Sequence, residues 1–353
     1  MFLKSSLYIE DLENVFETDI PAKDMQGSSV LITGASGLIG SFLVDALLHY
    51  SDVACYDIKV FAIGRDSASL EKRFKSHMGK PNFYIMQHDV KLPLTYHHDF
   101  DYVIHAASNA HPRAFSTDPV GTIMGNVLGV HNILEYARRG SMKRLLFVSS
   151  GEVYGQAVEG VASIGESYSG YIDSTNPRAC YPNGKRAAET LCVSYTNQYG
   201  IDTVIARPCH IYGPTATEFD SRVSAQFINS VLSGKDIVLK SLGTQLRSYC
   251  YVADCASGIL SVLLKGETSN AYNISNETST VTIREMAEMV AQMFGRAIRF
   301  ELADDNEKAS YNPATVSVLS VRKLEALGWQ AQYDMVTGLR RTVEVMKEVK
   351  RYG

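Results

Sequence analysis

Between Ser29 and Gly40 the chain reads SVLITGASGLIG, a short apolar run that leads into glycines at the spacing G-x-x-G-x-x-G. The apolar run predicts a buried strand, and the residues after Gly40 have the pattern of a helix. A glycine-rich turn between a strand and a helix binds the pyrophosphate of a dinucleotide in a Rossmann fold, because the helix N-terminus favours negative charge. The sequence therefore predicts an α/β fold that binds such a cofactor; a plain glycine-rich turn is the alternative.

Each of the three glycines has its own task in such a turn. Gly34 permits the tight bend, Gly37 lets backbone N–H groups approach the phosphates, and Gly40 lets the helix pack close to the strand. The residues of the turn that we expect to contact the cofactor are Gly34, Ser36, Gly37, Leu38, Ile39 and Gly40.

Strand-like runs and helical patterns alternate along the chain as far as Pro208. This alternation is typical of a doubly wound parallel sheet, so the expected fold class is α/β with a Rossmann-type sheet and a smaller C-terminal α+β lobe for the substrate. The strand candidates are Val30–Thr33, Lys59–Ile63, Asn82–Met86, Tyr102–His105, Arg144–Ser149 and Thr203–Arg207.

We expect three parts in the chain. Residues 1–27 form an N-terminal arm. The arm either docks, or contacts a second copy in a dimer, or remains a partly ordered tail. Residues 28–208 form the dinucleotide-binding domain, to which residues 248–268 return. Residues 209–247 and 269–353 form the smaller lobe, which covers the cleft and holds the substrate.

Tyr181 and Lys185 lie four residues apart at the start of a predicted helix, so both side chains are expected on one face. An ammonium group beside a phenol, near a cationic nicotinamide ring, favours the phenolate; we therefore expect the pKa of Tyr181 to fall from its reference value of about 10. A phenolate can take the proton from an alcohol that is being oxidised. Two exposed helical residues at this spacing are the alternative.

A polar segment follows the apolar run 144–148 and includes Ser150 and Glu152. Ligands of open α/β sheets bind at the carboxyl ends of the strands, which is where this segment is expected. Ser150 could donate a hydrogen bond to the same substrate oxygen that Tyr181 deprotonates. A serine turn that caps a strand is the alternative.

Composition excludes several classes of function. The net charge of −4 gives no reason to expect nucleic acid or an anionic membrane as a partner. Six cysteines without a C-x-x-C pair argue against a zinc knuckle, and no metal site is expected. The N-terminus lacks the apolar core of a signal peptide, and no apolar run approaches the roughly 18 residues of a membrane span. A cytoplasmic protein with free thiols is expected.

Together these residues resemble the extended short-chain dehydrogenase/reductase family, in particular its nucleotide-sugar epimerase/dehydratase group and, within it, UDP-glucuronate decarboxylase (UDP-xylose synthase). The resemblance extends from about Ser28 to Trp329. It rests on Thr33-Gly34-x-x-Gly37-x-x-Gly40, His105-Ala106-Ala107-Ser108, Asn126, Ser149-Ser150, Tyr181-x-x-x-Lys185, Arg207-Pro208, Tyr212-Gly213-Pro214 and Arg247-Ser248-Tyr249.

The resemblance implies an enzyme that oxidises sugar C4 transiently with bound NAD or NADP. Tyr181 would be the base, Lys185 its pKa tuner and a ribose ligand, Ser150 a donor to O4, and Glu152 a group near C5. The further cofactor ligands implied are Arg65, Asp89, Val90, Ala106, Ala107, Ser108, Asn126 and Arg207. The substrate ligands implied are Ser108, Arg113, Gly151, His210, Arg222 and Arg247.

Three reactions start from the 4-keto sugar, and Glu152 helps to separate them. The glutamate resembles that of decarboxylases and 4,6-dehydratases, whereas 4-epimerases typically lack it. Dehydratases also carry an aspartate just before the glutamate, where this chain has Gly151, so decarboxylation of a UDP-glucuronate-like substrate is favoured. His210 replaces the asparagine of the decarboxylase branch, which leaves the nucleotide and the sugar open.

The choice between NAD and NADP is open. An acidic residue at the end of the second strand usually holds the ribose 2′-OH of NAD, but Gly64 and Arg65 stand there. Arg65 favours a 2′-phosphate, the resembled branch mostly keeps NAD, and Asp66 is a second candidate for the ribose.

The sequence also bears on the assembly of the protein. Relatives of this kind are commonly homodimers, and an apolar stripe at helical spacing would suit a helix-bundle interface or face the sheet instead. The stripe consists of Val127, Val130, Ile133, Leu134 and Ala137.

A non-catalytic dinucleotide-sensing scaffold is the alternative from another class of function. Such proteins tend to lose the serine, tyrosine or lysine, all of which are present here.

Overall fold

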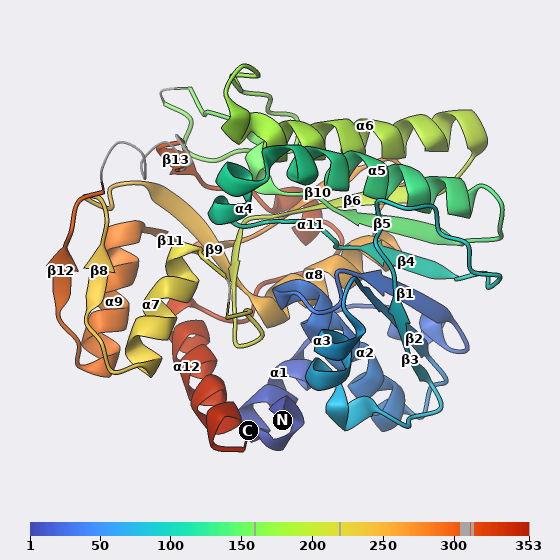
Figure 1. The fold of residues 1–353 in the computed structure, drawn as a ribbon, viewed down its shortest axis with the longest axis horizontal. Helices are drawn as coiled ribbons and strands as arrows, with labels where there is room; N and C mark the ends of the chain where they lie inside the picture. Colours follow the sequence, from blue (N-terminus) through green and yellow to red (C-terminus); the bar gives the residue numbers. More distant parts are fainter. Residues whose placement is uncertain (159, 219, 304–310, 312–313, 353) are drawn as a thin grey trace.

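A seven-stranded parallel sheet forms the centre of the larger lobe in the computed structural model, which describes residues 1–158, 160–218, 220–303, 311 and 314–352 (Figure 1). The order of the strands reverses between β1 and β4, and ligands of doubly wound folds bind at the carboxyl edge beside such a reversal. The predicted fold class is confirmed. In spatial order the strands are β10 (Ala271–Ile274), β6 (Thr203–Pro208), β5 (Arg144–Val148), β4 (Tyr102–His105), β1 (Ser29–Thr33), β2 (Lys59–Gly64) and β3 (Phe83–Gln87).

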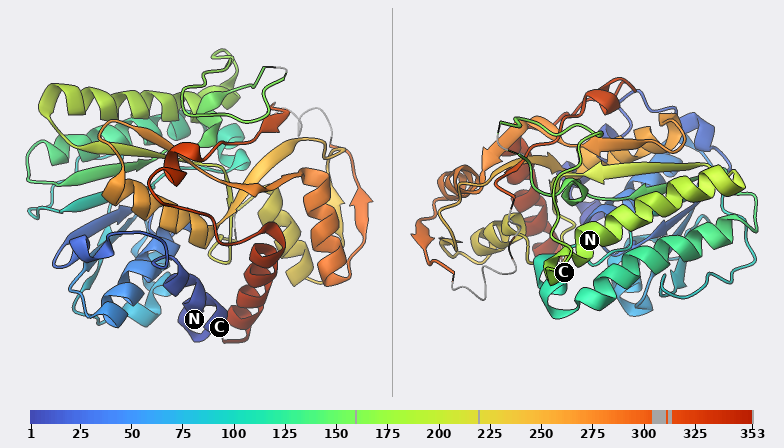
Figure 2. Two further views of the ribbon diagram at one scale, coloured as in Figure 1. Left: turned by 180° about the vertical axis from the view of Figure 1, so that it is seen from behind. Right: turned by 90° about the horizontal axis from the view of Figure 1, so that it is seen from above.

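Helices cover both faces of this sheet. α2 (Leu38–Ala54), α3 (Ser67–Arg73) and α8 (Val252–Lys265) lie on one face, and α5 (Pro119–Ala137) and α6 (Cys180–Tyr199) lie on the other (Figures 1 and 2). Val30 and Ile32 pack into the core on the α2 side, whereas Leu31 packs on the α5 side. A strand buried on both faces needs a continuous apolar run, which explains the sequence of β1.

The six predicted strands are present, and no end differs from the prediction by more than one residue. β10 is an addition: it pairs parallel with β6 and extends the first sheet, so residues 271–274 belong to the larger lobe and not to the smaller one. The return to the larger lobe therefore runs from α8 to β10. β9 (Leu246–Tyr251), which begins the expected return, lies in the sheet of the smaller lobe.

Among the described residues, the smaller lobe holds short sheets and the helices α7 (Val223–Leu232), α9 (Ile283–Phe294) and α12 (Met335–Tyr352) (left in Figure 1). β9 pairs with β7 (His210–Tyr212), β11 (Asn276–Thr282) and β13 (Val316–Ser317), and β8 (Ile237–Leu239) pairs with β12 (Ile298–Phe300). Two short helices, α4 (Pro112–Thr117) and α11 (Arg322–Glu325), lie in connections.

The N-terminal arm is docked on its own chain. Its helix α1 (Ser6–Asn14) lies between α2 and α12, close to the C-terminus (Figure 1). Leu12 is fully buried, and the Asp11 carboxylate accepts hydrogen bonds from Tyr251 at 2.6 Å and from Arg341 at 2.7 Å. Of the three interpretations of the arm, the structure agrees with docking.

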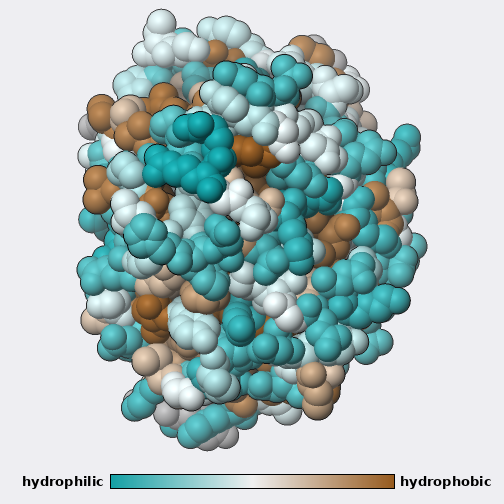
Figure 3. Space-filling view, turned by 90° about the vertical axis from the view of Figure 1, so that its right-hand side faces the viewer, coloured by the Kyte–Doolittle hydropathy of each residue, from teal (hydrophilic) through white to brown (hydrophobic). Residues whose placement is uncertain are grey.

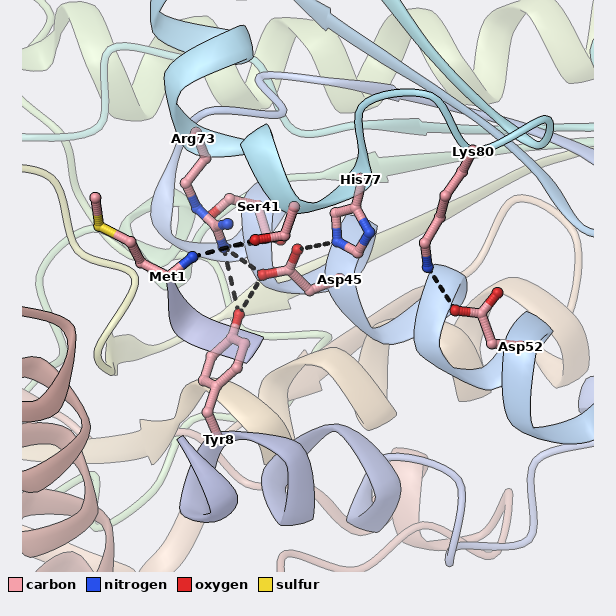
Figure 4. Close-up of polar contacts among 9 residues, drawn as sticks. Met1, Tyr8, Ser41, Asp45, Asp52, Arg73, His77 and Lys80 are labelled. Carbon is pink, nitrogen blue, oxygen red and sulfur yellow. Dashed lines mark hydrogen bonds and ion pairs between the residues drawn. The ribbon is translucent and has the colours of Figure 1, made fainter. Parts of the chain in front are cut away.

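A buried charge cluster holds the same helix of the arm through Tyr8 (Figure 4). Tyr8 donates to Asp45 on α2 at 2.6 Å, and Asp45 also pairs with Arg73 at 2.5 Å and with His77 at 2.8 Å. Burial alone would raise the pKa of Asp45, but Arg73 and His77 lower it to about 2. The carboxylate is therefore charged, and each of its neighbours stabilises that charge.

The surface at the right of Figure 1 is mostly hydrophilic, with hydrophobic residues scattered over it (Figure 3). No helix in the described part of the chain has the length and apolar character needed to cross a membrane.

We expect Asp45→Asn to lower the free energy of unfolding by about 3 kcal/mol near neutral pH, since removal of one partner leaves buried charge uncompensated. Because the native pKa of Asp45 is lowered to about 2, its stabilisation is present above the unfolded value of about 3.9 and is lost as the pH falls toward 2. Urea unfolding at several pH values measures this difference.

The matched control is Asp52→Asn (Figure 4). Asp52 lies on the same helix as Asp45, and its exposed carboxylate is paired with Lys80. The substitution should change stability little. Equal effects of the two substitutions would contradict the role of the cluster.

Candidate active site

A cavity of about 420 Å³ lies at the carboxyl edge of the seven-stranded sheet, between the two lobes. The larger lobe contributes the segments that follow β1, β2, β4 and β5, together with the first turns of α6. The smaller lobe contributes β7 and the N-terminal side of α7. The predicted residues that line the cavity are Gly34, Gly37, Leu38, Ile39, Gly40, Arg65, Ala106, Ser108, Ser150, Gly151, Glu152, Tyr181, Lys185, His210 and Arg222.

The glycine turn is built for close backbone approach. Gly34 has φ +67°, and a Cβ there would lie 2.7 Å from Cα of Ala107; a Cβ at Gly40 would lie 2.4 Å from the carbonyl oxygen of Gly34. The N-cap of α2 is Gly37, whose lack of a side chain leaves the first turn of the helix uncapped. An uncapped helix N-terminus beside a glycine cradle fits the pyrophosphate of a dinucleotide.

Tyr181 and Lys185 lie in the first two turns of α6 and are almost fully buried. The Lys185 ammonium donates to the carbonyl oxygen of Val148 at 2.8 Å and lies 5.9 Å from the centre of the Tyr181 ring. The prediction that they share a helix face is therefore confirmed by their position in one cavity.

The electrostatics of this pair differ from the expectation. Burial raises the pKa of Tyr181 to about 12, and Glu152 acts in the same direction. The hydrogen bond with Ser150 and the charges of Arg222 and Arg178 lower the pKa only in part. Burial also lowers the pKa of Lys185 to about 7. The neighbouring protein groups therefore do not compensate for the cost of placing a phenolate in a buried site.

Glu152 follows β5 on the 3-10 turn η4 (Gly151–Tyr154) and is paired with Arg178. One guanidinium nitrogen of Arg178 lies 2.9 Å from each carboxylate oxygen. A Cβ at Gly151 would lie 3.0 Å from the Cδ1 atom of Leu319, so a larger side chain there would have to displace the end of the Leu319 side chain slightly. The position that carries an acid in dehydratases is uncharged here.

The side of the cavity formed by the smaller lobe is less basic than expected. Arg222 is neutralised by Asp220, with contacts of 2.9 and 2.5 Å. Arg247 is buried behind the lining residues; it donates to Ala314 at 2.8 Å, and its Nη1 has no hydrogen-bond partner among the described residues. Burial, Arg247 and Arg222 lower the pKa of His210 to about 3, so its imidazole is neutral.

Two predicted cofactor ligands lie behind the lining. Asn126 accepts from Ser108 at 2.9 Å and so orients a residue that does line the cavity. Arg207 makes two hydrogen bonds to Glu189, at 2.9 and 2.6 Å, and Glu189 also accepts from Ser149. Both residues act through a neighbour in this structure.

The remaining predicted residues are not among those that line the cavity. The backbone N–H of Ala107 donates to Thr33, Asp89 pairs with Lys91, and the carbonyl of Val90 accepts from Asn132. Ser36 lies within the glycine turn, and Arg113 is exposed at the start of α4.

Sequence reasoning missed two side chains beside the catalytic candidates. Arg178 pairs with Glu152, and Phe115 stacks on Tyr181 with ring centres 4.6 Å apart. The position of Arg178 three residues before Tyr181 was a usable signal, because it places Arg178 on the short turn η5 that leads directly into the helix of Tyr181. Phe115 had none, since its contact joins segments distant in the sequence.

The NAD dependent epimerase/dehydratase family matches residues 30–275, which is more than half of the chain. UDP-glucuronic acid decarboxylase 5 of Arabidopsis thaliana is 34% identical over 88% of this chain and 86% of its own length. UDP-glucuronic acid decarboxylase 1 of Xenopus tropicalis is 31% identical over 96% of this chain and 78% of its own length.

Solved structures share the fold. The UDP-glucose 4-epimerase of Thermus thermophilus, in complex with NAD, superposes with a TM-score of 0.75 at 26% identity. The superposition covers 90% of this chain and 99% of the other.

We expect Gly40→Ala to weaken binding of the dinucleotide by roughly tenfold or more, because a Cβ there must push α2 away from the turn. Titration of the purified protein with the cofactor, followed by calorimetry, measures the affinity. The control is Gly125→Ala, whose Cβ would meet no atom within 4 Å. Unchanged affinity in Gly40→Ala would contradict the role of the turn.

Proposed function

Because the chain belongs to the NAD dependent epimerase/dehydratase family, we propose that it modifies a nucleotide sugar through transient oxidation at C4 and decarboxylates a UDP-hexuronate such as UDP-glucuronate. The observation that carries the proposal is the meeting of Tyr181, Lys185 and Ser150 with the glycine turn in one cavity, beside Glu152. Such a set suits removal of a proton from an alcohol next to a hydride acceptor.

When bound, the nicotinamide dinucleotide supplies a hydride acceptor and a positive charge. The glycine turn and the N-terminus of α2 would hold its pyrophosphate, and Lys185 would reach its ribose. Tyr181 takes the proton from the sugar 4-OH while Ser150 donates a hydrogen bond to O4. Burial raises the pKa of Tyr181 to about 12, so a further positive charge in the cavity favours the base form.

Decarboxylation follows from the 4-keto sugar when C5 carries a carboxylate. The C5–carboxylate bond breaks, CO2 leaves, and its electron pair becomes the enolate of the ketone. A proton then adds to C5. The hydride would return to C4 while Tyr181 gives the proton back to O4, which restores the alcohol. Glu152 lines the same cavity as Tyr181 and is the group proposed to act near C5, whereas Gly151 offers no acid for loss of a hydroxyl from C6, which disfavours dehydration.

The proposed substrate nucleotide is UDP, which is supported by the similarity to UDP-glucuronic acid decarboxylases. His210 stands where the decarboxylase branch has an asparagine, and its neutral imidazole can replace a neutral amide as a hydrogen-bonding group. Arg222 and Arg247 are the cations on this side of the site.

A homodimer formed by α5 and α6 also belongs to the proposal. The stripe expected to serve it is mostly turned inward, since Val130, Ile133 and Leu134 pack in the core against the sheet. Exposed apolar residues nevertheless stand on the outer side of the two helices: Val120, Met124, Val193 and Tyr199.

We expect the protein with NAD to convert UDP-glucuronate into a product lighter by one CO2, and Tyr181→Phe to reduce this rate by about a hundredfold or more while it still binds the cofactor. Mass spectrometry of the reaction mixture measures both. A product of unchanged mass with an inverted C4 signal in NMR would assign 4-epimerisation instead.

The same mixture separates the remaining alternatives. Loss of water would indicate a dehydratase. Absence of any product with UDP- and dTDP-sugars, despite tight cofactor binding, would support a dinucleotide-sensing scaffold and contradict the proposal.

The cofactor proposal is a nicotinamide dinucleotide whose 2′ position Arg65 contacts. Arg65 lines the cavity after β2, whereas the Asp66 carboxylate is engaged in capping α3 through Ala68 and Ser69. We expect Arg65→Ala to weaken NADP binding about tenfold and to leave NAD binding unchanged, since one charge-assisted contact is removed. Calorimetric titration with both cofactors measures this; equal losses would contradict the assignment.

A further inference from the structure

A second cavity of about 410 Å³ lies behind the catalytic one. The two cavities share the residues Gly151, Glu152 and Ser317, so Glu152 stands in the wall between them. Arg178, Asn176 and Asp173 line only the second cavity. Glu152 therefore faces the substrate site on one side and contacts Arg178 on the side of the second cavity.

The position of Arg178 is fixed by local structure. It lies on the 3-10 turn η5 (Pro177–Ala179), where the Asn176 side chain accepts from its backbone N–H at 2.9 Å. This turn leads directly into α6, which begins at Cys180. The side chain is held between Glu152, at 2.9 Å, and the face of Phe115, whose ring centre lies 4.5 Å from the guanidinium carbon.

Phe115 connects Arg178 to the proposed base. Its ring stacks on Tyr181, with centres 4.6 Å apart and an angle of 23° between the planes. Arg178, Phe115 and Tyr181 therefore form a continuous stack from three different elements: η5, α4 and α6. One guanidinium thus contacts the carboxylate near C5 and, through one intervening ring, the tyrosine that acts at O4.

We propose that Arg178 is a positioning residue that holds Glu152 in the wall of the sugar site and, by pairing with its charge, keeps that charge from opposing ionisation of Tyr181. This inference rests on the proposed function, because it assigns Arg178 a task in the reaction of Tyr181. Arg178 lines the second cavity and not the catalytic one, so it acts through Glu152 and Phe115.

The charges around Tyr181 agree with this assignment. Glu152 raises the pKa of Tyr181 and Arg178 lowers it. Removal of the Arg178 charge therefore leaves the effect of the Glu152 carboxylate on the phenol uncompensated. The other titratable or charged groups around the phenol are Cys180 and Lys185 on its own helix, Arg222 with its partner Asp220, and His111 and His210 in the same cavity.

The test follows the first hydride transfer in single-turnover experiments over a range of pH. The absorbance of the reduced nicotinamide reports the step in the unmodified protein, in Arg178→Met, in Glu152→Gln and in the double variant. Because Tyr181 must be ionised, the rate rises with pH. We expect Arg178→Met to move this rise to higher pH by about one unit, since it leaves a like charge beside the phenol.

The double variant is the decisive arm. If Arg178 acts by balancing Glu152, the added Glu152→Gln removes the unopposed charge and returns the rise toward its position in the unmodified protein. If Arg178 only supports the fold, the effects of the two substitutions add, and the pH at which the rate rises does not move back toward that of the unmodified protein. The second result would overturn the proposal.

Two further variants separate charge from structure. Arg178→Lys keeps the positive charge. The pH at which the rate rises should therefore stay within roughly a few tenths of a pH unit of that in the unmodified protein. The matched control is Arg284→Met on α9, which removes an exposed arginine that lies 2.9 Å from Glu288 and faces the Phe300 ring. It should leave the profile unchanged; a shift there equal to that of Arg178→Met would overturn the proposal.

The failures of the two proposals look different. An unmodified protein that transfers no hydride from any nucleotide sugar would contradict the proposed function, and this inference with it. An active protein whose pH profile is the same in Arg178→Met would contradict this inference alone.

Discussion

The close approach of main chain to main chain at the glycine turn is the constraint on which the rest of the structure depends. A side chain at Gly40 would collide with the carbonyl of Gly34, so α2 can pack against the turn after β1 only because Gly40 lacks one; a side chain at Gly34 would collide with the main chain of Ala106 and Ala107 after β4. The position of α2 then sets the floor of the cavity on one side. On its other side, α2 carries the buried carboxylate of Asp45, which anchors the N-terminal arm. Cofactor site and arm thus share one helix.

Burial decides the charge state of the groups in the site. Tyr181, Lys185 and His210 are each shifted toward their neutral forms, because the cavity removes water from them. Each carboxylate around the site is accompanied by an arginine in the ion pairs Arg178–Glu152, Arg207–Glu189 and Arg222–Asp220. The chain thereby keeps charged groups close to the chemistry without leaving any of these carboxylates unpaired, and the balance within each pair becomes a means of tuning the neighbouring phenol.

The two lobes are joined by more than the covalent chain. β9 of the smaller sheet leads without a loop into α8, which packs on the larger sheet. Asp11 of the arm binds Tyr251 at this junction and Arg341 of α12. The arm therefore holds the element that carries Arg247 toward the cleft, and the walls of the site come from parts that are mechanically connected.

The sequence by itself determined the features that depend on local spacing. The glycine turn, the alternation of strands and helices, and the shared helix face of Tyr181 and Lys185 all follow from residues within one or two turns of each other, where backbone geometry is regular. Other cavity-lining residues, among them Ala106, Ser108 and His210, were predicted only through the resemblance to a family. Only the tertiary structure decided the seventh strand, the docking of the arm, the pairing of Arg178 with Glu152, and the direction in which the pKa of Tyr181 moves. These depend on contacts between distant segments and on the loss of water around a group, and neither is encoded in the spacing of neighbouring residues.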